Sequence, residues 1–234
     1  MQAESKKNGD LRFQNLEGGV DFGKRFLYHL VWTMTNYDFH YFVRMDDDYF
    51  MCMDRFIQEV PMPPRSYYHW GWVHCIPGIV RPEESLILLS RDIVETFIGQ
   101  DPDKILCHKW ADQMIGIWNK ELNLKKFYRH DHRLHHDPPA AHIQSFATET
   151  NICHKYLGVH GSYPEQQRVL WRHRGPSTYE PNKSFDDYSD FCEHPSEMDW
   201  RPFGGEWHGE PKLCKDNPVW EGPRGDTYKG REGH

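Results

Sequence analysis

The amino-acid sequence predicts an α/β fold, and three observations carry that prediction. The 234 residues suffice for one large domain with a sizeable core. Apolar residues recur every three or four positions in several segments, as in amphipathic helices, and short continuous apolar runs between them are typical of buried strands. A predicted helix is followed by a strand that ends in polar residues, which is the usual layout of an α/β sheet with a site at the strand ends. We therefore expect helices packed on a central sheet.

The composition divides the chain into three parts. Residues 1–19 are a polar lead-in, with at most a short strand at 11–13. Residues 20–174 carry the helix and strand patterns and form the expected main domain. Residues 175–234 follow neither period and are rich in Gly, Pro and isolated Trp. They predict an irregular tail that wraps the domain or stays partly mobile, with Cys192 and Cys214 as candidates for fastening it.

The first expected helix lies between residues 20 and 36. Its apolar residues share one face, at Phe22, Phe26, Leu27, Leu30, Val31 and Met34. Residues 40–45 follow as a buried strand, because they form a short apolar run after the helix stop. This helix and strand lead directly into the most acidic turn of the chain.

The remaining elements are expected in a regular order. They are a short helix at 54–60 that Pro61, Pro63 and Pro64 stop, an extended aromatic segment at 67–72, a buried strand at 86–89, a helix at 91–98 with Ser90 as its cap and Gly99 as its stop, a helix that begins at Asp112 and carries Met114, Ile115 and Trp118 inward, a strand at 125–128, a His-rich loop at 129–142, and a helix from Pro164 to about Trp171.

Charge and hydropathy exclude several classes of function. The formal net charge of -7 argues against a general nucleic-acid or anionic-membrane binder, because such partners require a positive field. No apolar run approaches the length of a membrane span, and the first twenty residues are polar rather than signal-like.

The six cysteines bear on whether the protein resides in an oxidising or a reducing compartment. They are even in number and include no C-x-x-C pair, which favours secretory-pathway disulfides over a zinc site. Asn182-Lys183-Ser184 also fits the glycosylation acceptor pattern. The polar N-terminus leaves two interpretations open: a targeting segment that lies upstream of this chain, or reduced cysteines in a cytosolic protein.

Three consecutive carboxylates, Asp46, Asp47 and Asp48, follow the predicted strand at 40–45. Adjacent negative charges repel one another, so a site that holds them together favours a hard divalent cation. In extended chain Asp46 and Asp48 point the same way and Asp47 faces the other side. The alternative is a solvated acidic turn, which is what most charge runs are.

Several stretches in a fixed order resemble the inverting β-1,3-glycosyltransferase family, which comprises galactosyltransferases, N-acetylglucosaminyltransferases and the fringe enzymes. The resemblance spans residues 16–171. It rests on Met45-Asp46-Asp47-Asp48-Tyr49-Phe50 as the metal motif, residues 65–72 as the strand after it, residues 86–94 as the acceptor-side strand and helix, Trp110-Ala111-Asp112-Gln113-Met114-Ile115-Gly116 as the segment that opens the second catalytic helix, and Tyr156-Leu157-Gly158-Val159-His160 as the late strand that ends in a histidine.

The resemblance implies a glycosyltransferase type A fold, with a mixed central sheet flanked by helices and an incomplete N-terminal part. It assigns Asp46, Asp47 and Asp48 to cofactor binding, with Mn²⁺ or another divalent cation held by Asp48, Asp46 and His160. Asp112 would be the general base. A cation that bridges the two phosphates stabilises the leaving diphosphate, and inversion requires one base on the opposite face.

The implied reaction is transfer of galactose or N-acetylglucosamine from a UDP-sugar to a glycan hydroxyl on a glycoprotein or glycolipid, with a β-1,3 linkage. The resemblance also implies residence in the Golgi lumen or at the Golgi membrane, with a membrane segment absent from this chain.

The chain departs from the family pattern at three places. Ala111 stands where the family carries a second acidic residue, and residues 82–85, Pro-Glu-Glu-Ser, stand where it carries glycines. The chain also starts about two strands and a helix late. Two alternatives therefore stay open: a non-catalytic relative that binds a glycan or a partner protein, and, more weakly, a metal-carboxylate hydrolase of phosphate esters.

Three further groups have a functional and a structural interpretation. The histidines His130, His132, His135, His136 and His142 suit a transition metal, but without Cys or carboxylate partners at fixed spacing a flexible, partly exposed loop is favoured. Trp70 and Trp72 suit stacking on a sugar ring, with core packing expected for one of the pair. Lys24 and Arg25 suit a diphosphate, although a solvated helix face is favoured.

Overall fold

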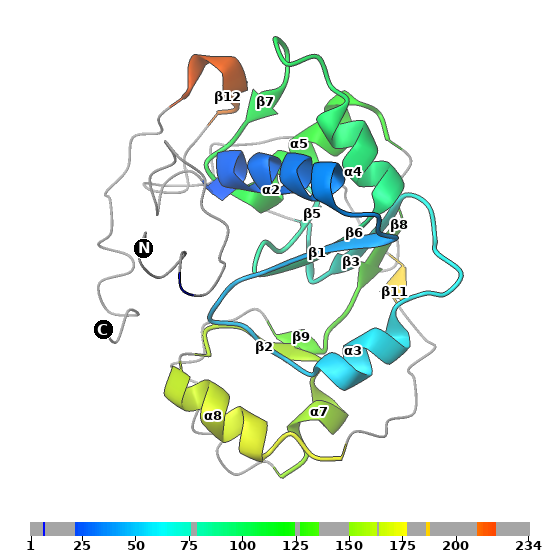
Figure 1. Cartoon of the computed structure of the whole chain (residues 1–234), viewed down its shortest axis with the longest axis vertical. Helices are drawn as coiled ribbons and strands as arrows, with labels where there is room; N and C mark the ends of the chain where they lie inside the picture. The colour runs from blue at the N-terminus through cyan, green and yellow to red at the C-terminus, as the bar shows by residue number, and fades with distance from the viewer. Residues whose placement is uncertain are drawn as a thin grey trace.

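The computed structural model describes Lys7 and residues 22–75, 79–124, 127–135, 150–162, 164–176, 186–187 and 210–218. These residues form a mixed α/β structure in which three helices lie over a central sheet, while a smaller sheet and further helices lie on its other side (Figure 1). The α/β prediction is therefore confirmed at this level. None of the helices in the described part of the chain has the length and apolar character needed to cross a membrane.

The central sheet has five strands and mixed direction. In spatial order they are β1 (Tyr41–Met45), β6 (Leu86–Ser90), β3 (Tyr68–Gly71), β8 (Phe127–His130) and β11 (Asp186–Asp187). β3 and β8 run parallel, and the other three pairs are antiparallel. The register places Val43 opposite Leu88, so the strand that leads into the acidic turn lies beside the most buried strand of the sheet.

One face of the sheet is covered by α2 (Phe22–Asn36), α4 (Arg91–Ile98) and α5 (Ala111–Glu121) (Figure 1). Their apolar faces meet in one core with the inward side chains of the sheet. Trp118 lies at its centre, stacked on Phe26 at 6.5 Å and edge-on to Phe97 at 5.0 Å between ring centroids. The other face packs against α3 (Met53–Glu59), where Phe56 stacks on Trp70 at 4.9 Å.

The smaller sheet carries the late part of the chain back to the acidic turn. Its strands are β2 (Phe50–Met51), β10 (Gly158–Val159) and β9 (Leu134–His135), with β10 antiparallel to β2 and parallel to β9. α7 (Ile152–Lys155) and α8 (Pro164–Arg172) flank it, and the Cys52–Cys153 disulfide ties β2 to α7. A Cβ on Gly158 would lie 2.2 Å from the Tyr49 ring, so close packing at this point requires glycine.

Short pairs complete the described structure. β4 (Val73–His74) pairs with β5 (Arg81–Pro82), and β7 (Leu106–Cys107) pairs with β12 (Lys212–Leu213), which leads into the 3₁₀ turn η3 (Cys214–Asp216). A disulfide joins Cys107 to Cys214. Two described segments of the predicted tail, 186–187 and 210–218, therefore pair with the domain.

Most of the expected helices and strands lie where the patterns place them, but several details were wrong. The strand expected to be buried at 40–45 is β1, in which Phe42 is buried but Val43 and Met45 are exposed, because β1 is the edge strand of the described sheet. The strand expected at 125–128 begins at Phe127 and continues to His130, and β9 lies inside the expected loop at 129–142. The polar side chains of this region are buried because protein partners satisfy them, so the hydrophobic pattern missed the strands. Ser90 precedes α4 without capping it, since its hydroxyl donates to Asp92 and accepts from the backbone of Tyr68.

Several expectations lie outside the described residues. These are the strand at 11–13, the histidines His136 and His142, Cys192 and the glycosylation acceptor at Asn182.

Candidate functional site

The three carboxylates form the turn between β1 and β2, and backbone hydrogen bonds fix that turn on both sides. The backbone N–H of Tyr49 donates to the carbonyl of Asp46 at 3.2 Å, which closes the turn. The N–H of Asp46 donates to the carbonyl of Ser85 at 3.0 Å, which holds the turn to the segment before β6. The carboxylates are therefore held at the end of a sheet strand rather than on a free loop.

His160 meets this turn from the end of β10. Its Nε2 lies 3.5 Å from Oδ1 of Asp48 and 3.8 Å from Oδ2 of Asp46, and one ligand atom from each residue lies within 4.8 Å of the others. The N–H of Ser162 donates to the Asp48 carbonyl at 2.5 Å, so the backbones are joined as well. The sequence predicted this proximity across more than a hundred residues, and the structure shows it.

The electrostatics of the three-residue cluster fit a divalent cation. The side chains of Asp46 and Asp48 are each 25% exposed and that of His160 is 21% exposed, so a ligand can reach all three. Burial raises the pKa of Asp46, even though Arg44 and His160 act in the opposite direction. Two carboxylates and one imidazole suit Mn²⁺, which accepts oxygen ligands and imidazole in the same shell.

Asp47 has a different environment from its two neighbours. It is exposed and stands outside the three-residue cluster, as predicted, although the reason is the turn at residues 46–49 and not the alternation of an extended chain. Its backbone carbonyl accepts a hydrogen bond from the Gln167 side chain at 2.9 Å, which attaches the turn to α8. Asp47 is also one of the residues that line the neighbouring cavity.

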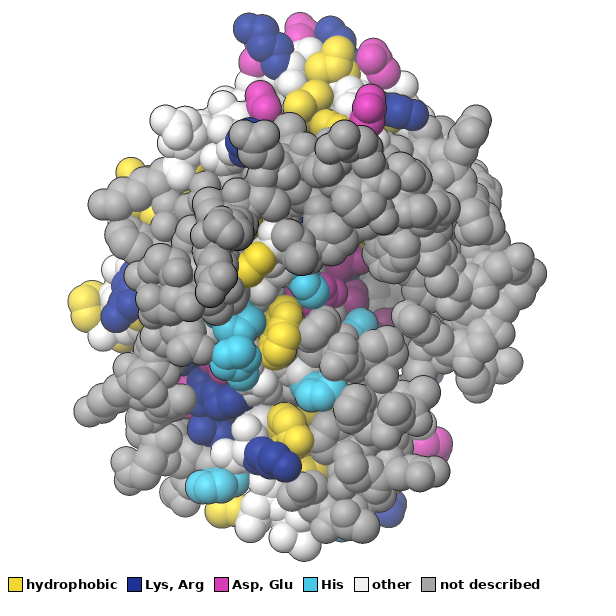
Figure 2. Space-filling model, turned by 180° about the vertical axis from the view of Figure 1, so that it is seen from behind, with side chains coloured by type: hydrophobic (Ala, Val, Ile, Leu, Met, Phe, Trp, Pro, Cys, Tyr) yellow, Lys and Arg dark blue, Asp and Glu magenta, His cyan; other side chains and the backbone are white. Residues whose placement is uncertain are grey.

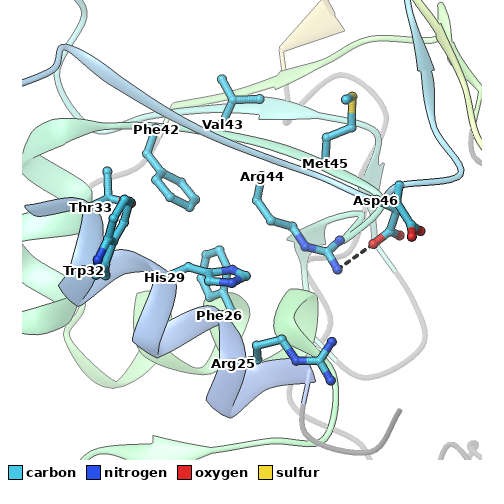
Figure 3. Close-up of a pocket in the computed structure, with 11 residues that line it drawn as sticks. Arg25, Phe26, His29, Trp32, Thr33, Phe42, Val43, Arg44, Met45 and Asp46 are labelled. Carbon is cyan, nitrogen blue, oxygen red and sulfur yellow. Dashed lines mark ion pairs between the residues drawn. The ribbon is translucent and has the colours of Figure 1, made fainter. Parts of the chain in front are cut away.

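That cavity, of about 470 Å³, lies between α2 and β1 and extends to the acidic turn (Figure 3). Arg25 and His29 project into it from α2, and Arg44 reaches from β1 toward Asp46, with Nη2 to Oδ1 at 2.7 Å. Burial, with help from Arg44 and Arg25, lowers the pKa of His29. Aromatic side chains contribute to the lining from Phe26, Trp32 and Phe42, and the remaining lining residues are Thr33, Val43, Met45 and the acidic turn.

The two basic residues considered as diphosphate ligands on the first helix, Lys24 and Arg25, have different environments. Arg25 lines the cavity, whereas the Lys24 ammonium donates to the side chain of Asn217.

The start of α5 forms a second acidic group. Arg81 Nε donates to Oδ2 of Asp112 at 2.6 Å, and the N–H of Gln113 donates to Oδ1 at 2.6 Å. Asp112 is buried, with 6% of its surface exposed. Its position in the first turn lets the helix dipole favour its charge.

Glu84 lies beside Asp112 and was missed by sequence reasoning. Its Oε2 accepts the backbone N–H of Ala111 at 2.9 Å, so a side chain 27 residues earlier binds the first turn of α5. The preceding residue, Trp110, supplies no side-chain cap. Burial and the Asp112 carboxylate raise the pKa of Glu84 well above its usual value. No periodic pattern in the sequence connects residues 84 and 111.

The segment 83–85 joins the two acidic groups. The carbonyl of Ser85 accepts a hydrogen bond from the N–H of Asp46. The N–H of Glu83 donates to the carbonyl of Trp72 at 2.6 Å. The side chain of Glu84 bonds the start of α5. The metal cluster, the end of the aromatic strand and the base candidate therefore meet at one turn. Two of the three departures from the glycosyltransferase pattern, at Ala111 and at 82–85, meet here.

The two tryptophans of the aromatic segment separate into a core residue and a surface residue. Trp70 is fully buried, with the Arg129 guanidinium 3.6 Å from its ring centroid. Trp72 is part-exposed and contacts the rings of His130 at 4.9 Å and His132 at 5.5 Å. Figure 2 shows histidines gathered around hydrophobic side chains in a hollow, with acidic side chains next to them.

The histidines from the end of β8 onward have mainly structural contacts. His130 is the last residue of β8, it is buried, and its Nδ1 accepts the N–H of Val73 at 2.9 Å, so the expectation of a flexible, partly exposed loop was wrong for this residue. Among the described residues, the metal-competent group is the one at Asp46, Asp48 and His160, and it includes none of the histidines between 130 and 135.

Comparison of the chain with models of known protein families and with curated protein sequences finds no match.

Proposed function

We propose that this protein is a metal-dependent inverting glycosyltransferase of type A fold. It would transfer galactose or N-acetylglucosamine from a UDP-sugar to a glycan hydroxyl and form a β-1,3 linkage. The observation that carries the proposal is the convergence of Asp46, Asp48 and His160 at the end of a sheet strand, joined through one turn to the carboxylates at the start of α5. The family resemblance of the sequence motifs supplies the reaction.

The donor would bind at the acidic turn and the adjoining cavity. Asp48, Asp46 and His160 would hold Mn²⁺, which when bound supplies Lewis-acid stabilisation of the leaving diphosphate. Arg25 and Arg44, from opposite walls of the cavity, would form charge-assisted hydrogen bonds with the phosphates of the donor. The aromatic lining suits a nucleobase, because aromatic rings stack favourably.

The acceptor would bind at the end of the aromatic strand and the start of α5. Trp72 offers a part-exposed ring for a sugar face, and Asp112 is the residue to which the resemblance assigns proton abstraction. A glycan on a glycoprotein or glycolipid is the expected acceptor class. The disulfides Cys52–Cys153 and Cys107–Cys214 are compatible with the Golgi lumen as its compartment.

A second candidate function is glycan or partner binding without turnover. The observation that favours it is the environment of Asp112, whose two oxygens each accept a hydrogen bond from the protein. A base with both oxygens engaged is less available to a substrate hydroxyl.

Release of UDP distinguishes the two functions. The protein is incubated with UDP-galactose or UDP-N-acetylglucosamine and a panel of glycan acceptors, with Mn²⁺ or with a chelator. We expect acceptor-stimulated UDP release that the chelator abolishes. Glycan binding without UDP release from either donor would support the non-catalytic function, and absence of Mn²⁺-dependent UDP binding would contradict the metal site itself.

A further inference from the structure

The two carboxylates at the start of α5 differ in how many protein donors they accept. Asp112 accepts one at each oxygen, at 2.6 Å from Arg81 Nε and 2.6 Å from the N–H of Gln113, and it is buried. Glu84 accepts one, from the N–H of Ala111 at its Oε2, and it is part-exposed. A carboxylate oxygen has two lone pairs, so Glu84 has the larger free accepting capacity of the two.

The position of Glu84 also suits contact with an acceptor hydroxyl. The turn that carries it is bonded to Asp46 of the metal cluster through Ser85 and to the end of the aromatic strand through Glu83. Its side chain reaches the first residue of α5. Glu84 therefore lies where a donor held at the metal cluster and an acceptor held near Trp72 would meet.

We infer that Glu84 is a second acid–base residue of this site: its carboxylate accepts the hydrogen bond of the acceptor hydroxyl and takes the proton, with Asp112 as its charged neighbour. This inference rests on the proposed glycosyl transfer. Nothing in the sequence pattern assigns a role to Glu84.

The proton and electron balance of the step is simple. The acceptor O–H bond breaks, and its proton moves to Glu84. The oxygen lone pair forms the new bond to the anomeric carbon. The bond from that carbon to the diphosphate oxygen breaks, and its electron pair leaves on UDP. The base acts on the face opposite the leaving group, as inversion requires.

The charges around Glu84 set the direction of its pH response. It faces Asp112 from α5, Arg44 and Asp46 from the end of β1, and Glu83 from its own turn. Burial and Asp112 raise the pKa of Glu84, whereas Arg44 opposes the rise. A raised pKa makes the ionised carboxylate a stronger base, and transfer then falls on acidification at a higher pH than for an ordinary glutamate.

The test compares two conservative variants by their pH profiles. Glu84→Gln keeps an amide oxygen for the Ala111 N–H, so the fold and the helix start are retained. We expect transfer to fall by about 100-fold or more, the acidic limb of the kcat/KM profile to disappear, and Mn²⁺-dependent UDP binding to stay within roughly two-fold. Asp112→Asn should keep an acidic limb and move it to lower pH, because Glu84 loses a negative neighbour. Glu121→Gln, an exposed carboxylate at the other end of α5, is the matched control and should change transfer by less than about three-fold.

Two outcomes overturn the inference in different ways. If Glu84→Gln keeps the acidic limb and near-normal transfer while Asp112→Asn abolishes both, Asp112 alone is the base and the glycosyltransferase function stands. If the unaltered protein binds Mn²⁺ and UDP but transfers no sugar to any acceptor, the proposed function fails, and the role of Glu84 fails with it.

Discussion

The two acidic ends of the candidate site differ in how their negative charge is neutralised. At the end of β1, Asp46 and Asp48 face each other across His160, and Arg44 is bonded to Asp46. At the start of α5, Arg81 and a backbone N–H engage both oxygens of the buried Asp112. The first group keeps part-exposed ligand atoms for a cation from solution, whereas the protein itself has already neutralised the second. In the proposed function, residues of one chemical type would serve metal binding at one end and proton transfer at the other.

The largest expected effect is on proton transfer at the α5 end. Asp112→Asn should lower glycosyl transfer by about 100-fold, because the amide removes the negative charge that makes the neighbouring Glu84 a stronger base. Binding of UDP with Mn²⁺ should stay within about three-fold, since the donor binds at the other end. Steady-state kinetics and isothermal titration calorimetry measure the two quantities. An equal loss of both would show that Asp112 belongs to the donor site.

Removing each of the two described disulfides in turn tests which of them positions His160 against Asp46 and Asp48. They close loops of similar length, with sequence separations of 101 for Cys52–Cys153 and 107 for Cys107–Cys214, so their removal should cost similar unfolding free energy, about 2–5 kcal/mol. Cys52 lies next to β2, and its N–H donates to the Leu157 carbonyl just before β10, which carries His160 to the acidic turn.

Replacing Cys52 and Cys153 by serine should therefore weaken Mn²⁺ binding by about ten-fold. The same replacement at Cys107 and Cys214 should leave Mn²⁺ binding unchanged. Denaturant unfolding and Mn²⁺ titration are measured on both variants. Equal Mn²⁺ affinity in the two would show that the small sheet holds His160 in place without the first disulfide.

A buried network of ion pairs lies next to the same small sheet. It makes the unfolding free energy depend on pH, with a smaller expected effect than those above. Glu59 on α3 accepts from Arg129 Nη2 at 2.9 Å and from Arg133 Nη2 at 2.6 Å. Burial alone would raise the pKa of Glu59 and of Asp131, but Arg133, together with Arg55 at Glu59 and Arg129 at Asp131, outweighs it and lowers both pKa values. Their stabilising contribution is complete above the unfolded-state pKa values, near pH 4, and is lost as the pH falls through the lower folded values.

We therefore expect the unfolding free energy to fall below about pH 4, by roughly 1.4 kcal/mol for each unit of pKa lowering. Glu59→Gln should make that fall shallower and destabilise the protein at pH 7, since Arg129 is buried and loses a partner. Urea unfolding at a series of pH values measures both. An identical slope in the variant would mean that Glu59 contributes nothing to acid sensitivity.

The smallest expected effect separates Asp47 from its neighbours. Asp47→Asn should change Mn²⁺ affinity by less than about three-fold, because its exposed carboxylate stands outside the cluster and acts through water. A loss as large as that of Asp48→Asn, measured in the same titration, would show that all three carboxylates bind the cation.

Sequence periodicity predicted the parts of the fold in which apolar residues decide the structure. The helices at 22–36 and 91–98 and the strands at 41–45 and 86–90 lie where hydrophobic spacing places them. β8 and β9 were misjudged because their burial depends on polar partners such as Glu59 for Arg129, which have no period in the sequence.

Only part of the candidate site could be predicted from the sequence, because its polar contacts between distant residues follow no sequence pattern. The proximity of His160 to Asp48 followed from motif resemblance, and the structure shows it. The pairing of Arg81 with Asp112 and the reach of Glu84 to Ala111 depend on how the turn at 83–85 lies against α5. Such contacts between distant polar residues become visible once the fold is known.

Titration of Mn²⁺, followed by electron paramagnetic resonance in the presence and absence of UDP, tests the central claim most directly. The account predicts about one bound Mn²⁺ per chain, tighter binding when UDP is present, and an affinity at least about 100-fold weaker in Asp48→Asn. Asp54→Asn, an exposed carboxylate on α3, is the control and should bind like the unaltered protein. Equal Mn²⁺ affinity in the Asp48→Asn variant and the unaltered protein, or UDP binding that is indifferent to Mn²⁺, would contradict the account.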